Sequence, residues 1–543
     1  MTSAEARLAW RNYMYVRAAP VSANHGTYQS LPTPRTSQLR AEEVSVTYSH
    51  PVGCDLIHET LYGYDQGVFG GLLTNPLFQS TFDNPNPTIQ GQITSTYYLG
   101  CVFGAVVSRF VGDFLGRRQA IMLGCTLLTV GGAIQATSFG LPQLFVGRIV
   151  AGLGTGLNTT AIPMWHVESA KGLHRGKLVT LELVLNIFGI VIAHFLNYGL
   201  SFETQSAVSW RFPVAFQCFF AILTFSLVLV LPESPRWLIL RDRQEEAAAV
   251  VARYHTLPAS DVHVRAIVEG IAESVAQEVA DSKGSSWKEM FHNGRQQNFR
   301  RICLGAGTAF MQQLAGCNIV ATYLPVALEN SIGLGHHLSL ILAGCNEISL
   351  MFWGAFSILL IDRWGRKPLL LTSSLGMAIS LFLIAIALSY GFENSGIMAT
   401  VAIFLYNVFF GLGLLAIPWL YPAEINSQSM RNTGASISTT TNWLFVYVVV
   451  LVTPLGISNL GYGYYLMFGL FTLTFLPFIW YFYVETAGLT LEQIDQVFEL
   501  RYNTENAISY SQARREVIAS PSLMPRSSKN GLAAEKENIK RRD

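Results

Sequence analysis

The chain has 543 residues; half are hydrophobic and only 13% are Asp, Glu, Lys or Arg. A typical soluble protein carries about 25% charged residues, so this composition excludes a soluble protein and favours one with many membrane-spanning segments. The 36 basic residues nearly balance the 35 acidic ones, which argues against a nucleic-acid partner because such partners require a basic surface. Seven cysteines, most of them inside apolar runs, exclude a secreted disulfide scaffold.

Eleven apolar runs are long enough to cross a bilayer as helices, since a span needs about 20 residues. A twelfth run, Leu61–Leu73, has only about 13 residues, too few to span, and follows a stretch that contains Asp55, His58 and Glu59. We therefore expect residues 1–60 to be a cytoplasmic segment that is either disordered or an error of gene prediction. The eleven runs lie near 92–111, 120–139, 143–166, 178–201, 212–232, 302–328, 338–361, 369–390, 398–422, 434–457 and 462–484.

Lys and Arg gather in alternate connections between these runs, and positive charge marks the cytoplasmic side of a membrane protein. Both termini and the central loop therefore fall on the cytoplasmic side, which requires an even number of spans, and we predict twelve. The expected fold is an all-α polytopic membrane protein made of two six-helix bundles. We divide the chain into a first segment (1–60), an N-terminal bundle (61–232), a helical cytoplasmic loop (233–300), a C-terminal bundle (301–484) and a mostly disordered cytoplasmic tail (485–543).

Short charged motifs recur in the two halves. The string from Asp113 to Arg118 returns 249 residues later as Asp362 to Lys367, and an acid followed seven residues later by Arg occurs at 168–175 and again at 424–431. The positive-inside rule explains the basic residues but not the acids at fixed spacing. We infer a duplication of six helices, as in transporters whose bundles rock against each other. We interpret these residues as salt bridges of a cytoplasmic gate, which must separate when the inner side opens: Asp113, Arg117, Arg118, Glu168, Arg175, Asp362, Arg366, Glu424 and Arg431.

Longer strings occur in a fixed order along the chain. They are Gly63-Tyr-Asp65-Gln-Gly67, Gly147-Arg148-Ile-Val-Ala-Gly152-Leu-Gly154-Thr-Gly156, Pro232-Glu-Ser-Pro-Arg236-Trp237, Gln312-Gln313-Leu-Ala-Gly316-Cys-Asn318, Pro418-Trp419, Asn442-Trp443 and Val484-Glu485-Thr486. In this order the strings resemble the sugar porters of the major facilitator superfamily, especially the fungal sugar and polyol proton symporters. The resemblance runs from about Leu61 to Phe498 and implies a twelve-helix major facilitator fold. It adds Glu233, Arg236 and Glu485 to the gate salt bridges.

Some positions depart from the pattern of that family. Phe114 stands where Arg is usual, Leu183 where the fifth span has a sugar-binding Gln, and Thr322 where the first of two tyrosines is usual. The scaffold therefore matches the family better than the substrate pocket does.

Ionisable residues inside spans are costly, so an acid there is a functional candidate. In the resembled family, the acid of the first span faces the arginine of the fourth and carries the coupled proton, which assigns proton coupling to Asp65 and Arg148. Movement of an adjacent arginine switches a buried carboxyl between its neutral and ionised forms. The alternative is a static ion pair that fixes helix packing.

Amide side chains offer both hydrogen-bond donors and acceptors, which suits polyhydroxylated ligands. The resemblance assigns substrate binding to Gln312, Gln313, Asn318, Trp419 and Asn442. The alternative for the amides is hydrogen bonding between helices, and Trp419 either stacks on a sugar face or fills the bundle.

Three further polar residues are alternative substrate ligands. Glu182 or Asn186 would replace the amide missing from the fifth span, and Glu347 is an isolated acid in the middle of the eighth. The glycines at 152, 154 and 156 are expected to permit close helix contact.

No metal-ligand cluster, nucleophile motif or nucleotide-binding loop is visible, so we predict a transporter that is not an enzyme, has no cofactor and runs on gradients. It is expected to move a sugar or polyol by alternating access with a proton, as a monomer in the lipid bilayer of the plasma membrane. A facilitative uniporter, a small-metabolite exporter and a non-transporting nutrient sensor are the alternatives.

Overall fold

The computed structural model describes residues 56–169, 175–255, 257–284, 290–291, 293–390, 395–427, 430–504 and 508–519. Contacts divide the chain into residues 1–46 and 47–543, and all described residues belong to the second unit. These residues form helices and no strand, so the all-α prediction is confirmed. The predictions for the first 55 residues and for the chain beyond residue 519 fall outside the described residues.

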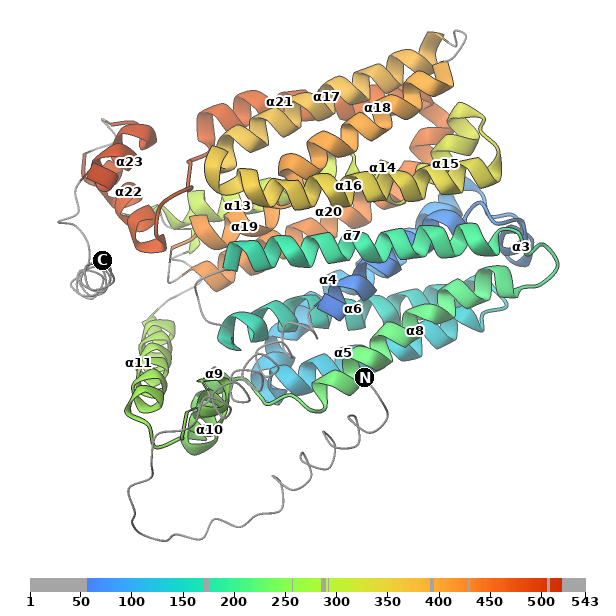
Figure 1. Ribbon diagram of the computed structural model, residues 1–543. Coiled ribbons are helices and arrows are strands. Elements are labelled where there is room, and N and C mark those ends of the chain that lie inside the picture. The colour runs from blue at the N-terminus through green and yellow to red at the C-terminus, as the bar shows by residue number, and fades with distance from the viewer. Residues whose placement is uncertain are drawn as a thin grey trace, which may run out of the picture. The chain divides into compact units, whose positions relative to one another are not determined.

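The N-terminal half contributes six long helices, each joined to the next by a short connection (Figure 1). A short helix, α3, follows the first of them. All five runs predicted in this half after Leu73 are confirmed as helices. The helices are residues 56–72, α3 (Pro76–Thr81), α4 (Pro87–Leu115), α5 (Arg117–Ala136), α6 (Leu141–Ser169), α7 (Arg175–Leu200) and α8 (Val208–Val228).

The helix over residues 56–72 corrects the predicted start at Leu61. His58 and Glu59 are only 0% and 8% exposed, so protein rather than lipid surrounds them. The cause is a close crossing with α7: a Cβ on Gly63 would lie 1.7 Å from the backbone oxygen of Asn186. Helices that touch through glycine in this way pack tightly in membranes. The polar start of the helix is therefore shielded by its neighbour.

The C-terminal half repeats the arrangement, with two interruptions. The predicted span 302–328 breaks at Gly316, whose φ of +86° requires glycine. The predicted span 398–422 changes to a π-helical turn before Pro418. The elements are α13 (Asn298–Leu314), α14 (Cys317–Ala321), α15 (Leu324–Ala327), η2 (Leu328–Ile332), α16 (His336–Trp364), α17 (Arg366–Tyr390), α18 (Ser395–Phe409), η3 (Phe410–Leu414), α19 (Ile417–Ile425), α20 (Arg431–Leu460) and α21 (Tyr462–Phe482).

Eight helices within the described ranges are long and apolar enough to cross a membrane. Four further segments run beside them: residues 56–72, α4, α6 and the broken α13 to α15. These four carry many Gly, Thr, Asn and Gln residues, which lower their hydropathy. The full count of twelve spans remains a prediction.

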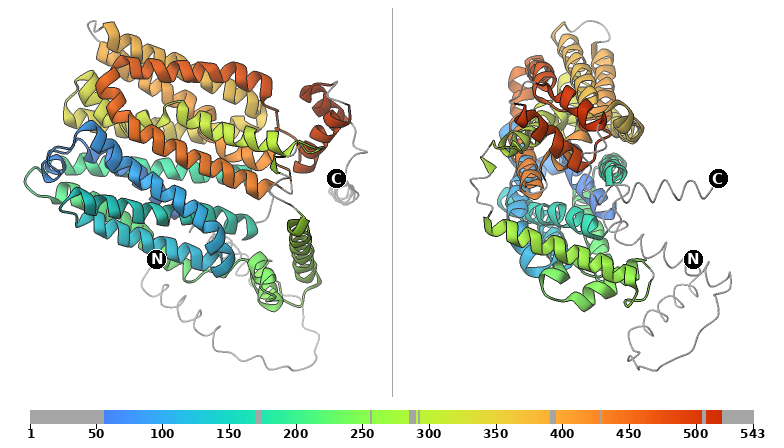
Figure 2. Two further views of the ribbon diagram at one scale, coloured as in Figure 1. Left: turned by 180° about the vertical axis from the view of Figure 1, so that it is seen from behind. Right: turned by 90° about the vertical axis from the view of Figure 1, so that its left-hand side faces the viewer.

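Extensive contacts between the halves are made where α4 packs on α20 and where α7 packs on α16 (Figure 2). A Cβ on Gly91 of α4 would lie 2.2 Å from a backbone oxygen of α20. Within the N-terminal half, Gly152 and Gly156 of α6 face α4 and Gly154 faces α5 at similarly short distances. The predicted role of these three glycines in close packing is confirmed.

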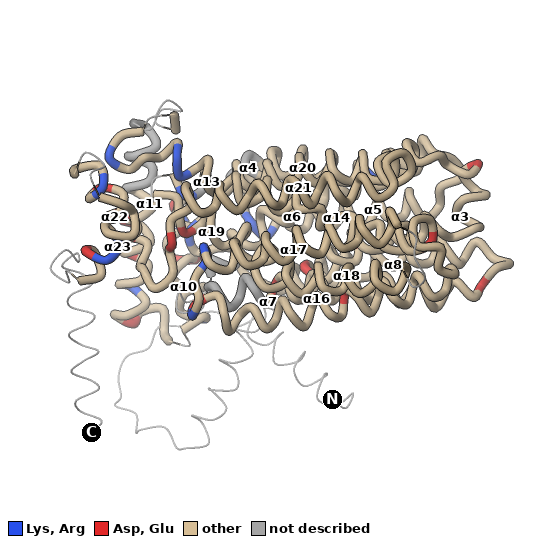
Figure 3. The backbone as a smooth tube through the Cα atoms, turned by 90° about the horizontal axis from the view of Figure 1, so that it is seen from above, with Lys and Arg blue, Asp and Glu red and all other residues tan. Residues whose placement is uncertain are grey.

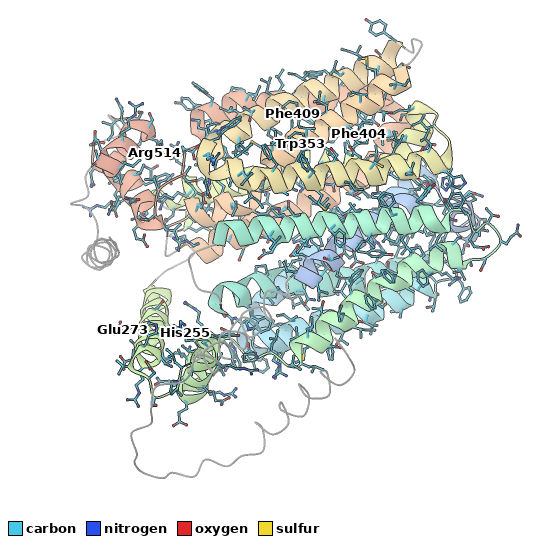
Figure 4. The ribbon with its side chains drawn as sticks, in the orientation of Figure 1. His255, Glu273, Trp353, Phe404, Phe409 and Arg514 are labelled. Carbon is cyan, nitrogen blue, oxygen red and sulfur yellow. The ribbon has the colours of Figure 1, made fainter. Side chains whose placement is uncertain are left out.

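Short helices and basic residues share one end of the bundle, called here the charged end (Figure 3). The central loop, predicted to be helical, forms α9 (Pro235–Leu240), α10 (Gln244–His255) and α11 (Val262–Gly284). His255 and Glu273 lie on α10 and α11, apart from the long helices (Figure 4).

The tail is more ordered than predicted, because α22 (Leu491–Asn503) and α23 (Tyr510–Ala519) occupy part of it. Arg301 of α13 pairs with Asp495 of α22 at 2.6 Å. Val497 of α22 packs with Ala513 and Val517 of α23. The apolar contacts therefore join the two tail helices to each other, and the ion pair joins α22 to the bundle.

Candidate functional site

Asp65 lies in the helix over residues 56–72 and is only 1% exposed. Its Oδ2 accepts a hydrogen bond from the Tyr97 hydroxyl of α4 at 3.3 Å, and that hydroxyl lies 2.8 Å from Thr155 Oγ1 of α6. The other oxygen, Oδ1, has no hydrogen-bond partner in the described part of the chain. Three helices therefore meet at one buried acid that keeps an open acceptor.

Arg148 of α6 is close to Asp65 but contacts it through Tyr97. The guanidinium donates to two backbone oxygens of α4 at 3.0 and 2.8 Å and lies 4.0 Å from the ring centre of Phe69 and 4.6 Å from that of Tyr97. None of the ion pairs between described residues joins Arg148 to Asp65. The Tyr97 ring thus receives the arginine while its hydroxyl contacts the acid.

Three aromatic side chains connect this acid with the C-terminal half. Tyr98, next to Tyr97, stacks on Trp443 of α20 with ring centres 6.2 Å apart. Tyr62, one helical turn before Asp65, meets the same indole edge-on at 5.5 Å. The aromatic layer formed by Tyr62, Tyr98 and Trp443 is buried and spans the boundary between the two bundles.

Four predicted substrate residues form one hydrogen-bonded group, called here the amide cluster: Gln312, Gln313, Asn318 and Asn442. Gln313 is its centre: its Nε2 donates to Asn442 Oδ1 at 2.7 Å, and its Oε1 accepts from Asn318 Nδ2 at 2.6 Å. The side-chain oxygen of Gln312 accepts from Gln313 Nε2 at 3.4 Å. The Nε2 of Gln312 donates to the backbone oxygen of Leu414 at 2.7 Å. The π-helical turn η3 exposes that oxygen, because such a turn breaks the regular backbone ladder.

Trp419, the fifth predicted substrate residue, lines a cavity with Gln312 and Asn442. The cavity has a volume of about 40 Å³, whereas small-molecule sites commonly measure about 300–1,000 Å³. This space holds water but no monosaccharide. The structure therefore shows the amide cluster closed on itself.

The three alternative ligands lie apart from the amide cluster's hydrogen bonds. Asn186 donates to the backbone oxygen of Glu59 at 3.4 Å and so joins α7 to the first helix. Glu182 is partly exposed on α7. Glu347 of α16 is fully buried, and neither carboxylate oxygen has a hydrogen-bond partner among the described residues.

At the charged end, the N-terminal charge cluster brings together Gly116, Arg117, Glu168, Glu233 and Ser234. Arg117 Nη2 pairs with Glu168 Oε1 at 3.0 Å, and the Ser234 hydroxyl donates to Glu168 Oε2 at 2.5 Å. The Glu233 carboxylate accepts the backbone N–H of Arg117 at 3.0 Å and that of the next residue at 3.1 Å. Glu233 thus binds the N-terminus of α5, where unpaired N–H groups attract an anion.

Arg118 completes this junction through its side chain, which donates to the backbone oxygen of Leu229 at 2.6 Å. Burial raises the pKa of Glu233, which lies outside the long helices, while the backbone N–H groups and Arg117 oppose that shift.

The C-terminal charge cluster consists of Gly365, Arg366, Glu424, Glu485 and Thr486. Arg366 binds Glu424 through two nitrogens, at 2.7 and 3.1 Å, and the Thr486 hydroxyl donates to Glu424 at 2.6 Å. The Glu485 carboxylate accepts two backbone N–H groups at the start of α17, both at 2.9 Å. Arg366 also pairs with Asp362 at 3.2 Å.

Four further predicted gate residues belong to the helices at this end. Arg236 lies on α9 and Arg431 begins α20. Asp113 and Arg175 belong to α4 and α7, but their side chains lie outside the described part.

Residues that the sequence did not single out complete both sites. Tyr97 carried no visible signal, because one tyrosine in an apolar helix looks like packing. Ser234 and Thr486 carried one: each directly follows a gate glutamate, in the strings Glu233-Ser234 and Glu485-Thr486. A Ser or Thr repeated at matching places indicates a shared contact rather than a chance polar residue.

The family model described as "Sugar (and other) transporter" matches residues 54–498. The chain belongs to the sugar transporter family. Its members are membrane transporters, so this protein is an integral, multi-pass transporter and not an enzyme. It is 40% identical over 449 residues to the MFS-type transporter oryC of Aspergillus oryzae, covering 81% of this chain and 83% of the relative. It is 37% identical over 456 residues to the sugar transporter STL1 of Saccharomyces cerevisiae, covering 82% and 80%.

Solved structures of a xylose transporter have the same fold. The inward-open xylose transporter XylE from E. coli superposes with a TM-score of 0.67 at 25% identity, covering 82% of this chain and 98% of that one. XylE bound to 6-bromo-6-deoxy-D-glucose, described as a proton:xylose symporter, gives a TM-score of 0.69 at 23% identity, covering 84% and 100%. The major facilitator fold is therefore confirmed.

Proposed function

We propose that this protein carries a sugar or polyol across a membrane together with a proton, by alternating access. The observation that carries the proposal is the buried Asp65, which is linked through Tyr97 to Arg148. Tyr62, one turn before Asp65, contacts Trp443, which follows Asn442 of the amide cluster in the chain. Relatives described as a sugar transporter and a proton:xylose symporter support the same substrate class and coupling ion.

Asp65 is the proposed proton carrier because an ionised carboxylate in a dry interior is costly unless a cation approaches it. In this conformation the Arg148 guanidinium is held by backbone oxygens and by two aromatic rings. A shift of α6 that brings Arg148 closer would favour the ionised acid and release the proton. Tyr97 contacts both groups, so it is a positioning residue for this exchange.

The amide cluster is the proposed sugar site. Its donors and acceptors satisfy one another while the cavity is closed. A sugar hydroxyl can replace these partners one for one, since hydroxyls both donate and accept. Exchange of equivalent hydrogen bonds costs little, which allows the site to open and close around a substrate.

The two charge clusters are the proposed inner gate. They lie at the charged end of the bundle. The distribution of Lys and Arg along the chain favours the cytoplasmic side for that end and for both termini. Their ion pairs lie within single bundles, so they set the angles between helices of one bundle and favour one conformation. We place the protein in the plasma membrane as a monomer.

The test is uptake of radiolabelled sugars and polyols, with pH recording, in a host without its own carriers. Uptake that acidifies the cell interior and stops with an uncoupler is expected. Asp65→Asn should abolish proton-driven uptake while leaving exchange of labelled for unlabelled substrate. Proton-driven uptake that survives Asp65→Asn unchanged would contradict the proposed carrier.

Tyr97→Phe should reduce proton-driven uptake and move its pH profile, because it removes the hydroxyl that contacts Asp65. Tyr64→Phe is the matched control: Tyr64 adjoins Asp65, is equally buried, and bonds the backbone oxygen of Pro213 in α8. Uptake unaffected by pH and uncoupler would indicate a uniporter. No uptake but altered gene expression would indicate a sensor, and outward movement an exporter.

A further inference from the structure

Glu347 occupies the middle of α16 and is the most isolated acid in the described part of the bundle. It is 0% exposed, and neither oxygen has a hydrogen-bond partner there. None of the ion pairs between described residues includes it. Asp65, by contrast, has a tyrosine hydroxyl on one oxygen. Buried polar groups are nearly always paired, so this exception needs an explanation.

The helices around Glu347 press closely on α16. A Cβ added to Gly344, one turn before Glu347, would lie 3.0 Å from the ring of Phe195 in α7. A Cβ added to Gly354, two turns after Glu347, would lie 2.8 Å from the Leu415 side chain. These contacts leave no room for bulk water. Glu347 is therefore buried on the helix that packs on α7 across the boundary between the two bundles, one turn after a residue that faces α7.

The neighbouring elements bring only weakly acidic or neutral groups to this level. Cys317 of α14 interacts electrostatically with Glu347, and Tyr406 of α18 donates to the backbone oxygen of Ala315 at 3.0 Å. His194 of α7 is fully buried, with neither ring nitrogen hydrogen-bonded in the described chain. The turn η3 carries no ionisable residue, and α17 beyond its first turn carries only Tyr390, at its exposed far end.

An ionised carboxylate in such a place would cost several kcal/mol, with nothing to offset it. The neutral acid is the form compatible with the closed structure. When the bundles part, water reaches the α7–α16 interface and can accept the proton, so the O–H bond breaks and a hydrated proton leaves. Proton binding and closure are then linked, because each favours the other.

We propose that Glu347 is a second proton-binding residue, which must be protonated for the bundles to close. The inference rests on the proposed transport function. Cys317 of α14 lies 3.4 Å from Gln313, at the centre of the amide cluster. Glu347 belongs to the same C-terminal bundle as that cluster, whereas Asp65 belongs to the N-terminal bundle.

The experiment is substrate exchange in proteoliposomes at equal pH on both sides, from about pH 5 to about pH 9. Exchange needs no proton gradient, and an Asp65→Asn background removes the first acid. In that background, exchange should fall severalfold as the pH rises. Adding Glu347→Gln should hold the rate at its low-pH level throughout, since an amide stays neutral.

Glu329→Gln is the matched control, because Glu329 pairs with His336 at the outer end of the same bundle and is partly exposed. It should leave the pH profile unchanged. A profile that Glu347→Gln also leaves unchanged would overturn the proposal. Absence of exchange by the unmutated protein would instead contradict the proposed function.

A second measurement needs no variant and no substrate. Hydrophobic carbodiimides react with protonated buried carboxyls, and peptide mass spectrometry locates the adduct. Labelling of Glu347 that fades as the pH rises is expected. If Asp65 is labelled and Glu347 is not, the proposal fails, even where Glu347→Gln does not fold.

Discussion

The N-terminal and C-terminal charge clusters share one plan but differ in how their arginine is held. In both, a glutamate accepts the backbone N–H groups at a helix start that follows a glycine. Arg117 then reaches Glu168 through one nitrogen, with both side chains less than a tenth exposed. Arg366 donates to Glu424 through two nitrogens, and the Glu424 side chain is 21% exposed, more than that of Glu168.

This difference separates the part of the plan that backbone geometry dictates from the part that can vary. The bond from glutamate to backbone needs a chain turn that only glycine makes, so it takes one form in both halves. An ion pair can be built from several rotamers, so burial in one half and bidentate geometry in the other serve the same purpose.

The largest expected effect comes from the two glycines. Gly116 and Gly365 have φ of +94° and +92° with ψ near 170°, a region open to glycine alone. An added Cβ would lie 2.5 Å from the Glu233 carboxylate or 2.6 Å from that of Glu485. In either alanine variant the backbone strain alone should cost about 1–3 kcal/mol of stability, and the clash with the carboxylate should add to this loss. The measurement is the thermal unfolding midpoint in detergent.

Gly488→Ala is the control for backbone strain alone, because Gly488 has a φ of +74° with nothing within 4 Å of an added Cβ. It should cost less than Gly116→Ala or Gly365→Ala. Equal losses in all three would show that the carboxylate contacts add nothing, and that the shared plan is only a turn.

A middle effect distinguishes the two arginines. Lysine can replace one charged contact but not a bidentate pair. Arg366→Lys should therefore lower the unfolding midpoint more than Arg117→Lys, with a difference of about 1–2 kcal/mol. A larger loss for Arg117→Lys would mean that burial, rather than the number of contacts, decides the strength of these pairs.

The smallest effect concerns pH. Burial raises the pKa of Glu233, so the folded protein binds this proton more tightly than the unfolded chain does. The stability that protonated Glu233 contributes is fully present below the pKa of this group in the unfolded chain. It is lost as the pH rises through the pKa of the group in the folded protein. In the wild-type protein this loss should amount to about 1 kcal/mol or less of unfolding free energy, just above the pH range in which carboxyl groups ordinarily titrate. Glu233→Gln should remove this pH dependence. Glu245→Gln, on the exposed face of α10, should not.

Much of the fold could be predicted from the sequence because hydrophobic run length reports directly on helices in lipid. All eleven long runs are helices, and the repeated charged motifs meet as Arg117–Glu168 and Arg366–Glu424. The start of the first helix was missed, since the burial of His58 and Glu59 depends on α7, whose Asn186 is 127 residues from Glu59. The breaks at Gly316 and η3 were missed because hydropathy does not register backbone angles.

The sequence by itself determined the class of protein, its two bundles and the residues that carry charge into the membrane, since each is a local consequence of composition and spacing. Only the tertiary structure decided which groups meet. It placed Tyr97 between Asp65 and Arg148, joined four amides from two distant segments, and buried Glu347 without a hydrogen-bond partner among the described residues. Such contacts join residues far apart in the chain, so they depend on how helices cross rather than on any run of residues.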